Sequence, residues 1–135
     1  MAVQLSVSVR NARLDAIETA IGTSAVLKIR TGAAPADVAT ADSGTVLASL
    51  TLPSDWLAAA SSGSKAKSGT WQDTSADGTG TAAHFRIYAS DGTTCHMQGS
   101  VTATGAGGDL QLDNTSISSG QSVTISSFSL TDANA

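Results

Sequence analysis

The chain opens with a strict alternation of polar and apolar positions. Leu5, Val7 and Val9 fall on one side of an extended segment, and the serines between them fall on the other side. A hydrophobic period of two residues is typical of a strand with one buried face. The pattern therefore predicts a half-buried β-strand over residues 4–9.

A helical period follows directly. Leu14, Ile17 and Ile21 recur at intervals of three and four residues, between an asparagine suited to the N-cap and a glycine suited to end the helix. This spacing predicts a short α-helix over residues 11–21. A helix of about ten residues is marginal on its own in water, so its apolar stripe must pack against something. We therefore take the three residues as candidates for an interface with the rest of the fold or with a neighbouring subunit.

Every later periodic segment has the pattern of a strand, and the segments between them are rich in small and polar residues. The predicted strands are 26–30, 45–52, a start at 70–72, 83–89, 94–103, 109–112 and 122–130, with one helical turn at 54–60 and surface loops at 31–44, 61–68, 104–108 and 114–121. About eight strands with such spacing are typical of a sandwich or barrel. We predict a single domain over residues 1–135, a mainly β, antiparallel, jelly-roll-like β-sandwich with one short N-terminal α-helix.

One hairpin can be placed in register from the sequence. A three-residue turn over 91–93, with Gly92 in the left-handed conformation, keeps apolar residues together on one face, whereas a two-residue turn mixes the faces. The predicted pairs are Phe85 with Gly99, Ile87 with Met97, Ala89 with Cys95, Arg86 with Gln98, and Tyr88 with His96. This register places Cys95 on the core face and the histidines His84 and His96 on the polar face.

Composition narrows the function classes. The chain has 135 residues, 41% hydrophobic and only 13% charged, with a formal net charge of −4 and one cysteine. An acidic chain is a poor ligand for phosphate backbones, so we expect no direct nucleic-acid binding. A single cysteine excludes an internal disulfide. The opening residues lack a signal-peptide pattern, and no apolar run is long enough to span a bilayer, so we expect no membrane association.

Candidate catalytic and metal-binding residues do not form a convincing set. His84 and His96 lie on one predicted face and Cys95 on the other, which makes Cys95 and His96 a poor nucleophile–base pair. A zinc or copper site from two histidines would need an oligomer. Asp73 to Gly78 resembles half of a calcium loop, but His84 stands at its closing position in place of a bidentate glutamate. We therefore predict no catalytic residues, no metal site and no cofactor, and we do not expect an enzyme.

The remaining candidates are interaction residues. Trp56 and Trp71 are either core residues or anchors of a subunit interface, and we place them beside the helix residues as interface candidates. Lys65 and Lys67 lie in a Ser/Gly-rich stretch, where a solvated loop is favoured over contact with an acidic partner. Residues 105–108 lack the full dinucleotide-binding glycine pattern and are predicted to be a turn.

Several segments resemble a small protein that recurs in tailed bacteriophages and prophages. The similar segments are 1–7, 10–18, 29–35, 52–56, 67–71, 84–86 and 94–99. The resemblance covers nearly the whole chain and implies a structural protein of the virion. Small virion proteins of this size are similar in using β-sandwich or jelly-roll domains as capsid cement, decoration or tail components.

From this resemblance we expect a capsid cement or decoration protein that binds and stabilises the major capsid shell. A tail, collar or fibre component, involved in assembly or host attachment, is the alternative. The expected partners are other virion proteins, the major capsid protein first, together with further copies of the chain in a dimer or trimer. The expected location is the virion, assembled in the host cytoplasm. A Ser/Thr/Gly-rich, weakly charged β protein is compatible with repeated packing in a large symmetric assembly.

Overall fold

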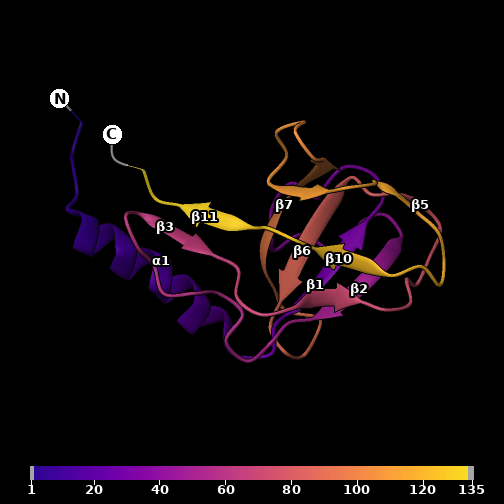
Figure 1. The fold of residues 1–135 in the computed structure, drawn as a ribbon, viewed down its shortest axis with the longest axis horizontal. Coiled ribbons are helices and arrows are strands. Elements are labelled where there is room, and N and C mark those ends of the chain that lie inside the picture. The colour runs from indigo at the N-terminus through magenta and orange to yellow at the C-terminus, as the bar shows by residue number, and fades with distance from the viewer. Residues whose placement is uncertain (1, 134–135) are drawn as a thin grey trace.

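The computed structural model describes residues 2–133 and shows a mainly β protein with one short helix, as predicted (Figure 1). The elements in chain order are α1 (Val7–Ile21), β1 (Val26–Arg30), β2 (Val46–Thr51), β3 (Ser64–Ala66), β4 (Trp71–Asp73), β5 (Gly80–Thr81), β6 (His84–Tyr88), β7 (Cys95–Ala103), β8 (Leu110–Leu112), β9 (Ser116–Ile117), β10 (Val123–Ile125) and β11 (Ser129–Thr131). The helix lies at one end of the elongated molecule beside β3 and β11 (Figure 1). We call α1, β3 and β11 the arm, and the remaining strands the β body.

The β body is built on a five-stranded sheet in the order β2-β1-β6-β7-β8. Its ladders are antiparallel except for the last, because β8 runs parallel to β7. Two further ladders, β4 with β10 and β5 with β9, belong to the body. The backbone N–H of Ser49 in β2 donates to the Asp73 carboxylate in β4 at 2.9 Å. This contact joins the sheet to the second layer, so the strands curl around one core in a sandwich-like fold.

Aromatic residues from both layers meet at the centre of this core. The Trp71 ring lies 6.0 Å from Trp56 and 5.5 Å from Phe128, measured between ring centroids, and Phe128 meets Phe85 edge to face at 5.8 Å. Both indole N–H groups donate to backbone carbonyls, so the buried rings leave no polar atom unpaired. Aliphatic side chains of β1, β2 and β6, such as Leu27, fill the rest.

The N-terminal segment is helical where a strand was predicted. The helix begins at Val7, four residues before the predicted start at residue 11, and the Ser6 hydroxyl caps it by accepting from the N–H of Val9 at 3.3 Å. The predicted strand over 4–9 is therefore wrong. Serine is among the best N-cap residues, and none of the strands in residues 2–133 forms a ladder with this segment. The predicted end of the helix at Ile21, before Gly22, is confirmed.

Most predicted strands are confirmed to within two residues, but the short ones were missed. β1 matches its prediction, and β2, β6, β7 and β8 differ only at their ends. The predicted strand over 122–130 is two strands, β10 and β11, which pair with different partners. β3 and β9 lie in segments predicted to be loops, β5 was not anticipated, and residues 54–60 contain no helical turn. Strands of two or three residues are too short to show a period of their own.

The hairpin of β6 and β7 confirms the left-handed conformation of Gly92 but corrects the length of the turn and its last pairs. The N–H of Ala89 donates to the Thr94 carbonyl at 3.0 Å, so the turn spans residues 90–93 and not 91–93. Gly92 has φ +70°, and Phe85 with Gly99, Arg86 with Gln98 and Ile87 with Met97 pair as predicted. A register shift after Ile87 then sets Tyr88 opposite Cys95, so His96 is the extra residue. Cys95 therefore lies on the same face as Arg86 and Tyr88, and its predicted place on the core face is wrong. A bulge of one residue exchanges the two faces of a strand.

Candidate functional site

The predicted interface residues are mostly interior residues of the single chain. Trp56 and Trp71 have no exposed surface, and Leu14 and Ile21 are buried beneath the helix. Ile17 is partly buried against the same core. The tryptophans are thus core residues, one of the two alternatives that the sequence left open, and Ile17 retains the largest free surface of the helix candidates.

The residues considered for catalysis and metal binding are held apart. His84 is buried, with its Nδ1 2.7 Å from the carbonyl oxygen of Gly32, whereas His96 is exposed on the strand bulge. The Cys95 sulfur contacts Arg86 rather than a histidine. Within residues 2–133 no group of three or more His, Cys, Asp or Glu side chains could hold a metal ion. His84 was predicted to lie on a polar, solvated face of the hairpin, and its burial shows that this prediction is wrong for His84.

The calcium-like segment has a structural explanation. One oxygen of the Asp73 carboxylate accepts from the N–H of Ser75 at 2.9 Å, and the other accepts from Ser49 in β2. Both oxygens that a cation would require are thus hydrogen-bonded to backbone, and the segment serves as the turn that joins β4 to the sheet. The glycine-rich segment after β7 is a turn, as predicted.

Lys65 was placed in a solvated loop by its sequence, but the structure buries it at the centre of the arm. Its ammonium group lies 2.7 Å from Asp15 and 3.0 Å from Glu18, and it also donates to the carbonyl of Ala58 at 2.8 Å. Only 2% of the side chain is exposed. Burial alone would lower the pKa of Lys65, but the hydrogen bonds that its ammonium group donates to both carboxylates outweigh this effect and raise that pKa.

The other charged side chains of α1 point toward the same side. Arg10 donates to the carbonyl of Asp132 at 3.0 Å, and Arg13 pairs with the Asp132 carboxylate at 3.2 Å, directly after β11. With Asp15 and Glu18 on Lys65, all four charged residues of the helix therefore contact β3, β11 or the residue that follows β11. These charged side chains hold α1 against β3 and β11, on the side where an ordinary surface helix has only its apolar stripe.

The exposed side of α1 carries a row of small apolar side chains, flanked by the exposed Ser8, Thr19 and Arg13. Val9, Ala12, Ala16 and Ala20 follow one another at helical spacing, and all are exposed. A surface helix usually points its charged residues to water and its apolar residues inward. In α1 Leu14 and Ile21 point inward as usual, but the charged side chains also contact the inner elements, which leaves the four small apolar residues exposed on the outer side. We call these four residues the outer α1 face.

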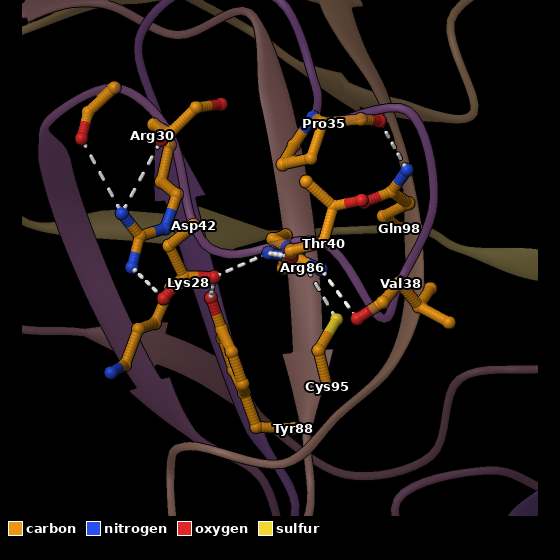
Figure 2. Close-up of polar contacts among 12 residues, drawn as sticks. Lys28, Arg30, Pro35, Val38, Thr40, Asp42, Arg86, Tyr88, Cys95 and Gln98 are labelled. Atoms are coloured by element: carbon orange, nitrogen blue, oxygen red, sulfur yellow. Dashed lines mark hydrogen bonds and ion pairs between the residues drawn. The ribbon is translucent and has the colours of Figure 1, made fainter.

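A second polar region lies on the outer side of the sheet, under the loop of residues 31–44, which we call the strap. Arg86 of β6 is 1% exposed, and its N–H groups reach the strap and the hairpin (Figure 2). Their acceptors are the Cys95 sulfur at 3.1 Å, the Thr40 carbonyl at 3.0 Å, the Asp42 carboxylate at 2.6 Å, and the carbonyls of Asp37 at 3.4 Å and Val38 at 2.8 Å. A guanidinium has five N–H donors. Arg86 therefore has none left for a ligand while the strap is in place.

Asp42 is the centre of this cluster. Its carboxylate accepts from Arg86, from Arg30 at 2.8 Å and from the Tyr88 hydroxyl at 2.7 Å (Figure 2). Burial opposes ionisation of Asp42, but the hydrogen bond from Tyr88 and the two guanidinium charges outweigh it and lower the pKa of the carboxyl group. Burial, together with the hydrogen bond to Asp42, raises the pKa of Tyr88 to about 12. The cluster is thus an ionic network in which one carboxylate is shared by two guanidinium groups and a hydroxyl. Arg30 Nε is a buried donor of this cluster for which the described residues supply no acceptor.

Sequence reasoning missed Arg30, Asp42, Arg86 and Lys65 as structural centres. Arg30 and Arg86 alternate with apolar residues in strong strand patterns, which suggested solvated positions. The sequence does show charged residues within apolar strands and a long loop between two strands. It does not show which face of the sheet that loop covers, so burial of these charges could not be predicted. Comparison of the chain with protein-family models, with curated proteins and with solved structures found no match. No helix in the described part of the chain is both long and apolar enough to cross a membrane.

Proposed function

We propose that this chain is a structural protein of a tailed-phage particle, which binds the outer surface of the major capsid protein as a cement or decoration protein. The proposal takes up the expectation drawn from the resemblance of seven of its segments to small phage and prophage proteins. The observation that carries the proposal is the outer α1 face, where Val9, Ala12, Ala16 and Ala20 present a row of small apolar side chains on the arm, at one end of the molecule. Covering such a face with a partner is favourable, because it removes apolar surface from water.

The small side chains favour close packing against a partner. The distance between a helix and its neighbour depends on the side chains at the contact, and alanine allows the shortest approach. On its inner side the helix is held by Lys65, Arg10 and Arg13 through contacts of 2.7–3.2 Å. These contacts fix α1 to β3 and β11, and the Trp56 indole N–H, which donates to the Gly22 carbonyl at 3.0 Å, ties the end of the helix to the core of the body. The outer face is therefore presented in a defined orientation before it binds. Preorganisation of this kind reduces the entropic cost of association.

The polar clusters favour binding over catalysis. Arg86 and Lys65 are the most deeply buried cations, and each is surrounded by acceptors from its own chain. His84 contacts a backbone carbonyl. We therefore propose that these groups maintain the shape of the domain, while the function resides in the surface of the arm.

Copy number in purified particles tests the location. Quantitative mass spectrometry of virions should give a number of chains comparable to that of the major capsid protein, and a cryo-EM map should place the arm against the shell. A few to tens of copies at the tail would contradict the capsid proposal and assign the chain to the tail, collar or fibre. Absence from purified particles would overturn the structural role altogether.

A pair of matched variants tests the surface. Ala16→Glu places a charge in the outer α1 face, whereas Ala106→Glu makes the same change on the exposed turn after β7. We expect A16E to reduce binding to capsids lacking the protein at least tenfold and A106E to have little effect, with both variants folded by circular dichroism. Equal binding by the two variants would overturn the role of this face.

The same preparations test self-association. We propose that apolar surface is also shared between copies, in a dimer or trimer, and light scattering at high micromolar concentration measures this directly. A clean monomer would contradict self-association, and the capsid-binding experiment would then still decide the proposed function on its own.

A further inference from the structure

The strap is attached to the sheet almost entirely by polar contacts. None of its fourteen residues, 31–44, is buried, and its largest apolar side chain, Val38, is 38% exposed. Besides the contacts of Arg86 and Arg30, the amide of Gln98 donates to the Pro35 carbonyl at 2.8 Å, and His84 contacts the Gly32 carbonyl. A segment that buries little apolar surface has little to lose when it leaves the protein surface. Its attachment therefore depends on the groups beneath it.

Those groups form a preorganised receptor for one carboxylate. Arg30 and Arg86 come from neighbouring strands, and Tyr88 lies two residues beyond Arg86 on the same face of β6. All three side chains are more than nine-tenths buried and converge on the two oxygens of Asp42 at 2.6–2.8 Å (Figure 2). Two guanidinium groups and a hydroxyl around one carboxylate are the donors that proteins use to bind carboxylate ligands.

We propose that Arg30, Arg86 and Tyr88 form a carboxylate-binding site on the outer face of the sheet, that Asp42 occupies this site as an internal ligand, and that the strap opens as a unit when Asp42 is lost or displaced. The proposal is independent of the virion role. Its physical basis is that the two buried guanidinium charges require a carboxylate. The other contacts that hold the strap are hydrogen bonds between its backbone carbonyls and side chains of the sheet, and they bury little apolar surface.

Opening would expose the floor of a cavity that already lies beside the strap. This cavity of about 340 Å³ is lined by residues 38–42 of the strap, by Arg86 and by Thr93, Thr94 and Cys95 of the hairpin. Cys95 is the only cysteine of the chain. The rate at which a thiol reagent labels Cys95 therefore reports on the strap without any added probe, and thermolysin cleavage near Val38 gives a second, chemically unrelated readout.

The first experiment removes the internal carboxylate. Asp42→Ala and Asp42→Asn are compared with the wild-type protein and with Asp55→Ala, which makes the same change in net charge at an exposed position outside the strap. We expect both Asp42 variants to label at Cys95 and to be cleaved in the strap about 10 to 100 times faster, the range for losing a hydrogen bond to a charged group. Asp55→Ala should match the wild type, and tryptophan emission should show an intact core in all four proteins.

The second experiment supplies a carboxylate from solution. Formate should slow the labelling and cleavage of Asp42→Ala back toward wild-type rates, whereas chloride at equal ionic strength should not. Unchanged rates in both Asp42 variants would overturn the proposed opening of the strap. Equal effects of formate and chloride would overturn the proposed carboxylate site. If Asp42→Ala fails to fold, formate must restore folding where chloride does not; otherwise the proposal is wrong.

Discussion

The β body and the arm are stabilised by different forces, although they belong to one small chain. The body surrounds an apolar core in which Trp71, Trp56 and Phe128 are in contact and almost wholly buried. The arm fully buries only Leu14 and Ile21 of its helix, and its remaining contacts are mostly ion pairs and hydrogen bonds, such as those of Lys65 and of the arginines of α1. A region held by apolar area tolerates changes of charge, while a region held by a few ion pairs depends on each of them.

The largest expected effect is the loss of stability when a buried side chain of the β body is truncated, compared with the same change in the arm. Trp71→Ala should lower the free energy of unfolding by about 3–5 kcal/mol, because it removes a fully buried indole and leaves a cavity. Ile17→Ala, in the half-buried stripe of the arm, should cost about 1–2 kcal/mol, below the range for isoleucines in a core. Urea unfolding followed by tryptophan emission measures both values. Equal losses would contradict the distinction between body and arm.

The polar layer of the body should be revealed at alkaline pH. The pKa of Tyr88 is raised from 10 to about 12, so the folded protein retains a proton that the unfolded chain releases near pH 10. The contribution of Tyr88 to the free energy of unfolding is therefore fully present below pH 10. It is lost as the pH rises from 10 to 12, and the loss is roughly 2–3 kcal/mol. Absorbance at 295 nm follows the phenolate directly because the chain has one tyrosine.

Tyr88→Phe is the matched control for this titration. It removes the phenol but keeps the ring, so the part of the alkaline stability loss that belongs to Tyr88 should disappear. An inflection near pH 10 in the wild-type titration would show that the strap does not shield the hydroxyl and would weaken the inference about Asp42.

The arm should respond to loss of its central cation. Lys65→Met keeps the apolar stem and removes the ammonium group from Asp15 and Glu18, which should cost about 1–2 kcal/mol because both carboxylates retain access to water. Lys67→Met, two residues along, is the matched control and should cost less than about 0.5 kcal/mol. Thermolysin cleavage within α1 should increase for the Lys65 variant only. Unfolding of the whole protein at the same urea concentration in both variants would contradict this role for Lys65.

The smallest expected effect is that of metal ions on either region. Melting temperatures with EDTA, calcium or zinc should coincide, because Asp73 uses both carboxylate oxygens on backbone N–H groups and His84 lies apart from His96. A ligand at a hundredfold excess over its Kd would add about 2.7 kcal/mol of stability. A shift of several degrees with one ion would therefore overturn the expectation and direct attention to Asp73, Asp77 or His84.

Local pattern was sufficient wherever an element carries its own signal. β1, β2, β6 and β7 have runs of β-forming residues, and the pairs Phe85 with Gly99 and Ile87 with Met97 follow from the register that keeps apolar residues on one face, although the bulge beside the turn does not. The helix was detected through Leu14, Ile17 and Ile21, but its first turn was not, because an alternating segment and a capped helix start look alike until the neighbours are known. Short strands such as β5 exist only through their partners.

The sequence by itself determined the mainly β class, the single helix ending at Ile21 and the strong strands of the sheet, since these depend on residues close together in the chain. Only the tertiary structure decided which charged residues are buried. Lys65 meets Asp15 across 50 positions, and Arg86 meets Asp42 across 44. The physical reason is that a buried charge is stable only beside its counter-charge, and chain folding, not local spacing, brings these pairs together.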